Sequence, residues 1–494
     1  MLELRVIFLF ISNKLKLKMK FATAIMATAV AAKYEADRVN SLPEMGTFDK
    51  YGAFSGYLDI ADTSKKIHYL FFEAQDDSDN APLLIWFNGG PGCSSMLGFM
   101  QENGPYRIES GSTKFHPSEF SWNRETNILY IEQPAGVGYS YCEGTKDCTF
   151  DDHTSGKDNL NVLLQWYEKF PEFKDNELYI SGESYAGVYV PYLAYYVNKH
   201  NEEAADDAFK PNLKGFAVGN GVTNWKYDTT AAFVDMSYWH SLMDEDMHEK
   251  FVKLDCNWNM PYMIGVSDEC LNLYTEFSTN VAEINVYDIF GTCWGAGPYP
   301  QATEEGTGFP HLYTGGKNKR HHQQFVTAAD YTPWVHQHKK AQNPKSLGEL
   351  PPCTFGSSLL DYMNSDAVRT AMNIPSFVQA WDLCTSNINY ISEPEASQWI
   401  YEALAGKIKM MHYSGDTDGA VPTIGTQNWI ASLGWNKTSE WQAYMVEGQV
   451  AGYWESYEGN LTFGTVHGAG HMAPQFKPRQ TYHLVMNWLF DREI

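Results

Sequence analysis

The segment at residues 178–199 constrains the fold more than any other part of this chain. An apolar run at 178–181 leads directly into Gly182-Glu-Ser-Tyr-Ala186, and a stretch of helical length and periodicity follows at 187–199. This order predicts a tight turn between a buried strand and a helix, with the Ser184 hydroxyl exposed at the carboxyl end of a sheet. The small residues two places before and after Ser184 suit the crowding at such a turn. Ser184 is therefore our candidate nucleophile.

Other short apolar runs indicate the sheet that would carry this turn. Each run ends in a Gly-rich or turn segment, as is typical of parallel strands covered on both faces. Residues 52–72 instead predict an antiparallel pair around a turn at 61–65. The predicted parallel strands are 83–87, 127–131, 178–181, 216–218 and 408–412, and the predicted helices between them are 157–170 and 187–199. The expected fold class is α/β, with a mostly parallel central sheet and helices on both faces.

The strand pattern stops near residue 224 and returns near residue 407. We therefore expect an inserted cap at 225–385 between a first core part at 43–224 and a second at 386–494. A chain of 494 residues accommodates one large domain with such an insertion. The irregular basic stretch at 317–340 is expected to be an exposed loop. Its histidines at 336 and 338 have no partner spacing, so we expect neither a metal site nor a cofactor.

A serine hydroxyl needs a base, and the base needs an orienting carboxylate. The run at 408–412 leads into Ser414-Gly-Asp-Thr-Asp-Gly419, which offers Asp416 and Asp418. We favour Asp418 because the Gly415-x-x-Asp418 spacing places it beyond the turn. Asp416 remains the alternative.

The candidate base follows the next strand-like run, at 461–466. His467-Gly-Ala-Gly-His-Met-Ala-Pro474 begins there, and His471 lies in its glycine-flanked part. We favour His471 as base and keep His467 as the competitor. The order Ser, Asp, His at successive strand ends is that of the α/β-hydrolase fold.

The tetrahedral intermediate of such a reaction needs backbone N–H donors. Trp86-Phe-Asn-Gly-Gly-Pro-Gly-Cys-Ser-Ser95 follows the run at 83–87, where this fold keeps one donor. Gly90 would let the backbone come close, and the N–H of Tyr185 would be the second donor.

The N-terminus and the cysteines predict the compartment. Residues 1–32 contain a signal peptide that we place from Met19 to a cleavage near Ala31 or Ala32, with an upstream extension. Its apolar runs are too short to span a membrane, so no membrane anchor is expected in the mature form. The eight cysteines lack CxxC spacing, which favours disulfides, although eight cysteines allow 105 pairings. Sequons at Asn436 and Asn460 predict glycosylation.

The charge excludes one class of partner. The chain has 36 basic and 60 acidic side chains, a formal net charge of −24. Phosphate backbones would be repelled over most of the surface, so no nucleic acid is expected.

Three segments together carry a family resemblance. Trp86 to Ser95, Gly182-Glu-Ser-Tyr-Ala-Gly-Val-Tyr-Val-Pro191 and His467 to Pro474 resemble the serine carboxypeptidases, from about Pro43 to the C-terminus. The resemblance implies that a second set of residues holds the terminal carboxylate of a peptide substrate, namely Trp86, Asn88, Glu102 and Glu183. It also places Met472 in an apolar S1′ pocket for the leaving residue.

Two carboxyl groups that face a substrate carboxylate cannot all be ionised. At least one of Glu102 and Glu183 must therefore keep a proton, and we expect substrate binding to be strongest at acidic pH.

The resemblance also implies disulfides that join Cys93 to Cys384 and Cys293 to Cys353. The remaining cysteines would then pair over short separations, Cys256 with Cys270 and Cys142 with Cys148.

The expected function is a serine-type carboxypeptidase that releases single, hydrophobic-preferred residues from peptide or protein C-termini through an acyl-enzyme on Ser184. The expected location is the secretory pathway, ending in the lysosome, the vacuole or outside the cell. A homodimer is compatible with the resemblance. Two alternatives stay open: an acyltransferase of the same fold, and a dual role as stabilising partner of other lysosomal enzymes.

Overall fold

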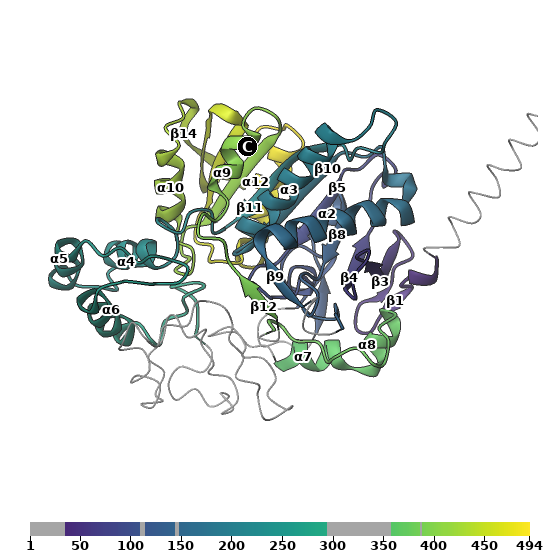
Figure 1. Cartoon of the computed structure of the whole chain (residues 1–494), viewed down its shortest axis with the longest axis horizontal. Helices are drawn as coiled ribbons and strands as arrows, with labels where there is room; N and C mark the ends of the chain where they lie inside the picture. The colour runs from purple at the N-terminus through teal and green to yellow at the C-terminus, as the bar shows by residue number, and fades with distance from the viewer. Residues whose placement is uncertain (1–34, 109–113, 144–147, 294–356, 386–387) are drawn as a thin grey trace, which may run out of the picture.

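A ten-stranded sheet forms the centre of the computed structural model, which describes residues 35–108, 114–143, 148–293, 357–385 and 388–494. The strand order is β14-β15-β16-β13-β11-β10-β5-β8-β4-β3 (Figure 1). The six central strands run parallel, and each edge of the sheet ends in antiparallel strands. The strands are β3 (Ala53–Asp59), β4 (Lys66–Phe72), β5 (Leu83–Phe87), β8 (Asn127–Ile131), β10 (Leu178–Glu183), β11 (Leu213–Gly219), β13 (Lys409–Gly415), β14 (Lys437–Val446), β15 (Gln449–Tyr457) and β16 (Leu461–Val466).

Three small two-stranded ladders lie outside this sheet. They pair β1 (Ser41–Leu42) with β2 (Gly46–Thr47), β6 (Tyr106–Ile108) with β7 (Phe115–Pro117), and β9 (Thr149–Asp151) with β12 (Asn389–Ile391). The short turns of helix are η1 (Glu35–Asp37), the π-helical η2 (Gly98–Glu102), η3 (Trp122–Arg124), η4 (Pro171–Phe173) and η5 (Glu458–Asn460).

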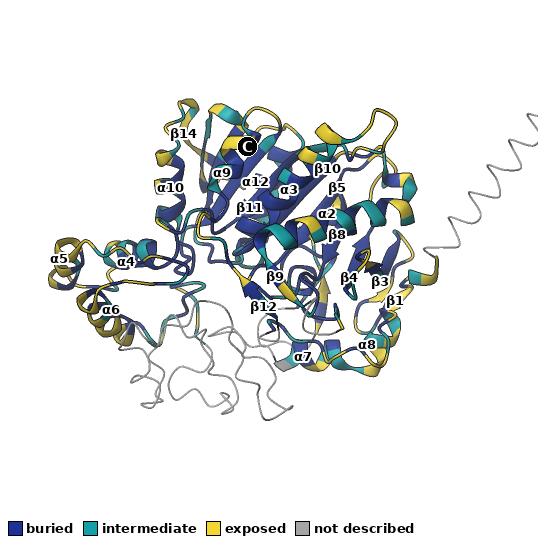
Figure 2. Ribbon diagram, in the orientation of Figure 1, coloured by how far each residue is buried: buried dark blue, intermediate teal, exposed yellow. Residues whose placement is uncertain are grey.

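The central strands are buried on both faces, as Figure 2 shows, because their side chains alternate between two core clusters. Leu83, Ile85 and Phe87 pack in one cluster, and Leu84 and Trp86 in the other. The first cluster includes residues of α2 (Asp152–Lys169), α3 (Ala186–Glu203), α9 (Gln398–Leu404) and α10 (Thr423–Ser432). The second includes residues of α7 (Ser357–Asn364), α8 (Asp366–Ala371), α11 (Ala473–Phe476) and α12 (Pro478–Leu489).

Helices α4 (Thr230–Trp239), α5 (Glu245–Leu254) and α6 (Asp268–Asn280) lie to one side of the sheet, at the left of Figure 1. They belong to the region expected to form the cap. Later in that region, α7 and α8 place Leu359, Met363 and Val368 in the second sheet cluster. The part of the expected cap nearest residue 385 therefore packs on the sheet, and the cap boundaries themselves stay a prediction.

The expected strands all appear within a few residues of their predicted bounds, and those at 83–87 and 127–131 match β5 and β8. Three of the four expected disulfides are present among the described residues: Cys93–Cys384, Cys142–Cys148 and Cys256–Cys270. Cys293 is also disulfide-bonded, but its expected partner Cys353 lies outside the described residues. The expected signal peptide and the basic stretch at 317–340 lie outside them as well.

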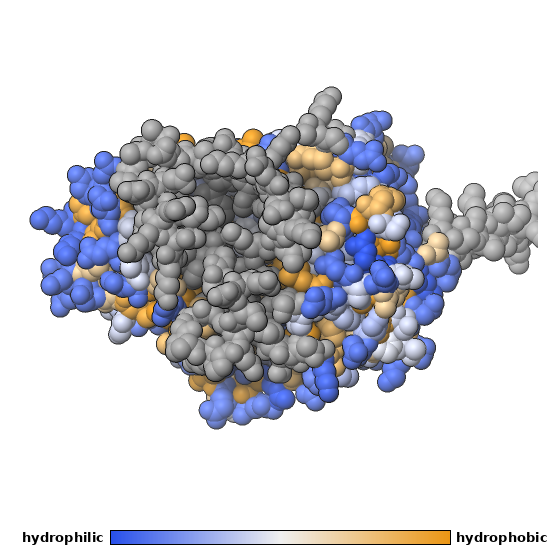
Figure 3. All heavy atoms as spheres, turned by 90° about the horizontal axis from the view of Figure 1, so that it is seen from below, coloured by the Kyte–Doolittle hydropathy of each residue, from blue (hydrophilic) through white to orange (hydrophobic). Residues whose placement is uncertain are grey.

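Seen from below, the described residues on both sides of the molecule are mostly hydrophilic, with smaller hydrophobic areas among them (Figure 3). Asn436 and Asn460, the two predicted glycosylation sites, are exposed. Among the described helices, none is both long and apolar enough to cross a membrane.

Candidate active site

Ser184 occupies the sharp turn between β10 and α3, with a φ of +65°. Its N–H donates to the carbonyl of Gly219, and its own carbonyl accepts from the N–H groups of Gly187 and Val222. A Cβ on Gly182 would come within 2.4 Å of the Phe87 carbonyl oxygen, so a larger residue would displace this turn. The strained turn holds the partly exposed Ser184 at the carboxyl end of the parallel strands, as predicted.

Asp418 and His471 meet at the same end of the sheet. They follow the neighbouring strands β13 and β16, and His471 Nδ1 lies 2.7 Å from Asp418 Oδ2, with both side chains buried. The Asp418 carboxylate also accepts hydrogen bonds from the backbone N–H groups of Ala420 and Val421 and from Asn220 Nδ2. Three donors other than the histidine thus fix the carboxylate that would orient it.

The other ring nitrogen of His471, Nε2, is buried and has no hydrogen-bond partner among the described residues. The His471 backbone N–H donates to the carbonyl of Tyr287, whose ring lies 5.0 Å from the imidazole. A Cβ on Gly470 would approach that carbonyl to 2.1 Å. The loop is therefore held against the Tyr287 segment while Nε2 stays available to accept a proton.

Asp416 and His467, the two competitors, bind each other instead. His467 Nδ1 lies 2.8 Å from Asp416 Oδ2, and the Gly468 N–H donates to Asp416 Oδ1. His467 is 67% exposed in its side chain, whereas the side chain of His471 is 3% exposed. Because a solvated pair gains little from its electrostatics, the buried pair is the better candidate for catalysis.

The four residues expected to bind a substrate carboxylate converge in one buried group. Asn88 Oδ1 accepts hydrogen bonds from Trp86 Nε1 and from the Gly98 N–H, each at 2.9 Å. These donors fix the orientation of the amide, so Asn88 Nδ2 donates to Glu102 at 2.8 Å and to Glu183 at 3.0 Å. A Cβ on Gly98 would come within 2.1 Å of Trp86 Nε1, which explains the glycine there.

Burial raises the pKa of both carboxyl groups, and a neighbouring negative charge raises that of Glu183 further. Burial raises the pKa of Glu102, and burial followed by the charge of Glu102 raises the pKa of Glu183 well above its usual range. The two groups are hydrogen-bonded to each other, which requires a proton on one of them. The second oxygen of each carboxyl group, Oε2, has no other hydrogen-bond partner among the described residues. The pair thus presents a neutral acid beside Ser184, which follows Glu183 in the chain.

The two backbone donors expected to bind an oxyanion lie on adjoining segments. Gly89 is so close to the turn that a Cβ there would come within 2.3 Å of the Tyr185 nitrogen. Gly90 follows with a φ of +113°, which a residue with a side chain rarely adopts. Among the described residues, neither the Gly90 N–H nor the Tyr185 N–H donates to another protein group. Met472, expected in the S1′ pocket, is partly exposed directly after His471.

Sequence reasoning missed Asn220 and Tyr287. Asn220 lies in Gly219-Asn-Gly221 at the carboxyl end of β11, which pairs with β13, so its position at a strand end was an available signal. Tyr287 contacts the histidine loop from a distant segment without any motif. No group of three or more His, Cys, Asp or Glu side chains within the described ranges is arranged to hold a metal ion.

Comparison with known proteins shows similarity to the serine carboxypeptidases. The family model for serine carboxypeptidases matches residues 43–491. Serine carboxypeptidase-like 20 of Arabidopsis thaliana is 32% identical, covering 93% of this chain and 94% of its own. Serine carboxypeptidase 1 of Hordeum vulgare is 30% identical, covering 88% and 89%, and the lysosomal protective protein of Mus musculus is 31% identical, covering 92% and 94%.

A solved structure shows the same fold. The prohormone-processing carboxypeptidase Kex1 of Saccharomyces cerevisiae matches with a TM-score of 0.63, at 22% identity, over 93% of this chain and 95% of that one. The sequence match over most of its length and the shared fold agree, and the chain therefore belongs to the serine carboxypeptidase family, a group of serine-type hydrolases with the α/β-hydrolase fold.

Proposed function

We propose that this carboxypeptidase removes single residues from peptide C-termini at acidic pH through an acyl-enzyme on Ser184. The observation that carries the proposal is the buried Glu102–Glu183 pair next to Ser184. A neutral carboxyl group and the Asn88 amide can donate to a substrate carboxylate, which an ionised pair would repel. Such a site selects the last residue of a chain and places its peptide bond near the turn.

The reaction then uses the Asp418–His471 pair. Ser184 Oγ attacks the carbonyl carbon of the last peptide bond, and its proton passes to His471 Nε2. The N–H groups of Gly90 and Tyr185 would stabilise the oxyanion. His471 returns the proton to the leaving amine as the C–N bond breaks. Water, activated by the same histidine, then hydrolyses the ester and restores Ser184.

Acidic pH favours this site because substrate binding needs the proton on the glutamate pair. As pH rises through the raised pKa of the pair, the site gains a second negative charge, and the substrate carboxylate is repelled. A lysosomal, vacuolar or secreted location suits such a pH dependence, and the similarity to a lysosomal protein of the mouse supports that route. Met472 would contact the leaving residue and favour apolar side chains.

A mass-spectrometric time course tests the proposal. A decapeptide with an apolar C-terminal residue, incubated at pH 5, should lose one residue at a time from that end. Ser184→Ala should abolish the loss. Ser181→Ala is the matched control, because Ser181 is a buried serine on the same strand whose hydroxyl donates only to the Ile85 carbonyl. Internal cleavage, or residue loss that persists in Ser184→Ala, would contradict the proposal.

A further inference from the structure

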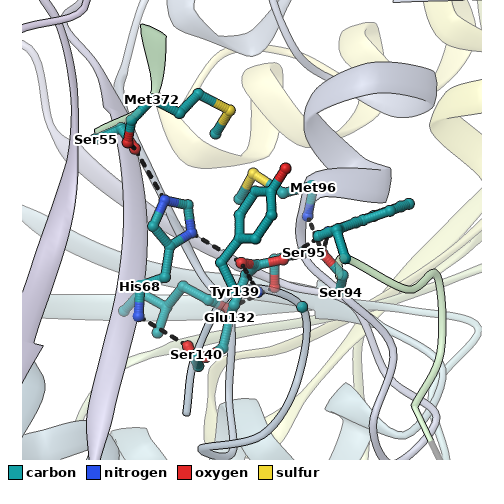
Figure 4. A network of polar contacts seen from close by, with 12 residues as sticks. Ser55, His68, Ser94, Ser95, Met96, Glu132, Tyr139, Ser140 and Met372 are labelled. Carbon is teal, nitrogen blue, oxygen red and sulfur yellow. Dashed lines mark hydrogen bonds and ion pairs between the residues drawn. The ribbon is translucent and has the colours of Figure 1, made fainter. Parts of the chain in front are cut away.

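A second series of serine, histidine and carboxylate lies within the sheet, away from Ser184. His68 on β4 has Nδ1 2.8 Å from Glu132 Oε2 and Nε2 2.8 Å from Ser55 Oγ (Figure 4). All three side chains are 0% exposed. The Ser55 hydroxyl donates to the Met372 carbonyl at 2.7 Å, so its proton is directed away from the histidine. A hydroxyl held in this way and closed to solvent does not serve as a nucleophile.

The hydrogen bonds also show where the Ser55 hydroxyl hydrogen points and that His68 Nε2 carries a proton. Because the single Ser55 hydrogen goes to Met372, His68 Nε2 must donate to Ser55 Oγ. Glu132 accepts from Ser94 Oγ and Trp381 Nε1 on Oε1, and from the Tyr139 N–H on Oε2 beside His68 Nδ1. Glu132 Oε1 thus has two donors, and one proton lies between Glu132 Oε2 and His68 Nδ1.

Glu132 connects this buried series to the segment that contains Gly90 through Ser94. Ser94 donates to Glu132 Oε1 and accepts from the Met96 N–H (Figure 4). The adjacent Ser95 accepts from the Asn88 N–H and donates to the Ile131 carbonyl, directly before Glu132 in the chain. The segment from Asn88 to Ser95 thus rests on residues 131 and 132.

The Glu132 carboxylate has little freedom to move. A Cβ on Gly138 would come within 1.9 Å of Glu132 Oε1, so the backbone packs directly against it. Glu132 Oε1 therefore gives the Ser94 hydroxyl a fixed acceptor. The Cys93–Cys384 disulfide and the Ser94 N–H to Leu383 bond hold the same segment from its other side.

We propose that Glu132 is a positioning residue for the oxyanion site: through Ser94 it holds the 88–95 segment so that the Gly90 N–H faces the Ser184 turn. This inference rests on the proposed roles of Ser184 and Gly90. An oxyanion donor acts only when it lies within hydrogen-bond distance of the developing charge, and small displacements are costly. The Ser55–His68 end of the series bonds to Oε2 of Glu132, whereas Ser94 bonds to Oε1.

The test uses phosphonylation of Ser184 by a fluorophosphonate, whose phosphoryl oxygen occupies the oxyanion position without requiring a peptide substrate. Ser94→Ala and Glu132→Gln should each slow this reaction on the order of tenfold per folded molecule, and kcat should fall in parallel. Ser55→Ala, at the other end of the series, should lower the melting temperature but leave the phosphonylation rate within twofold. Trp381→Phe removes the indole N–H that donates to both Ser94 Oγ and Glu132 Oε1 and keeps an aromatic side chain, and it provides a further variant if the first two fold poorly.

The two proposals fail in different ways. A wild-type protein that is phosphonylated but releases no residue from any peptide would contradict the proposed function alone. Wild-type phosphonylation rates in folded Ser94→Ala and Trp381→Phe would overturn the positioning role of Glu132. Equal slowing in Ser55→Ala and Ser94→Ala would overturn it too, because the effect would then be a general loss of stability.

Discussion

Glu183 and Glu102 are buried and share a hydrogen bond, and Asn88 donates to both of them. Glu183→Gln keeps a donor at this place but cannot ionise. KM for a blocked dipeptide should therefore change little between pH 5 and 8 in the variant, while it rises over that range in the wild type. Steady-state kinetics at several pH values measure the difference. A variant that retains the wild-type pH dependence would show that another group controls binding.

The two Asp–His pairs offer a matched comparison. Asp418→Asn should lower kcat by on the order of 10⁴, because the amide can no longer hold His471 in the productive tautomer. Asp416→Asn, in the exposed pair, should leave kcat within about twofold of wild type. Melting temperatures for both variants separate catalytic from folding effects. Loss of activity in Asp416→Asn alone would reverse the assignment of the pairs.

Asp228 makes stability depend on pH. Burial raises its pKa to about 7, and its Oδ1 has no partner among the described residues. The folded state keeps this proton more tightly than the unfolded chain, so the contribution to stability is complete below about pH 4 and is lost as pH rises through 7. Asp228→Asn should remove on the order of 3 kcal/mol of the decrease in unfolding free energy between pH 5 and 8.

Denaturant unfolding at both pH values tests this, with the exposed Asp207→Asn as control for the loss of one negative charge. The amide suits the site because the N–H groups of Thr223 and Asn224 donate to one carboxylate oxygen only. An unchanged pH dependence in Asp228→Asn would mean that other buried acids determine it.

The disulfides should differ in what they contribute. Cys93–Cys384 closes a separation of 291 residues, and Cys142–Cys148 one of 6. The chain-entropy relation gives about 6 kcal/mol for the first and about 2 kcal/mol for the second. Paired Cys→Ser variants, compared by denaturant unfolding, should show that order. A larger loss from the Cys142–Cys148 variant would contradict it.

The central strands could be predicted because buried parallel strands are short apolar runs that end in turn residues. The same reasoning could not find β14, because most side chains of Lys437–Val446 are exposed and the segment contains no apolar run. Ser184 and His471 could be placed by local motifs. Asp418 could be ranked above Asp416, but only the structure shows that each aspartate has its own histidine.

Contacts between distant segments were beyond sequence reasoning. Tyr287 and the His68–Glu132 pair have no repeated spacing or motif, and each acts through a partner far along the chain. His68 lies within an apolar strand, and Glu132 follows one, so each reads locally as an ordinary strand residue. Their contact can be inferred only when it is known that β4 and β8 are neighbours in the sheet.

The most direct test of the account compares one blocked dipeptide as its free acid with the same dipeptide as its C-terminal amide. The Glu102–Glu183 site predicts that kcat/KM at pH 5 favours the acid by at least about tenfold, because the amide leaves buried donors unpaired. The preference should shrink toward pH 8 and disappear in Ser184→Ala together with all turnover. Equal kcat/KM for acid and amide at pH 5 would contradict the account.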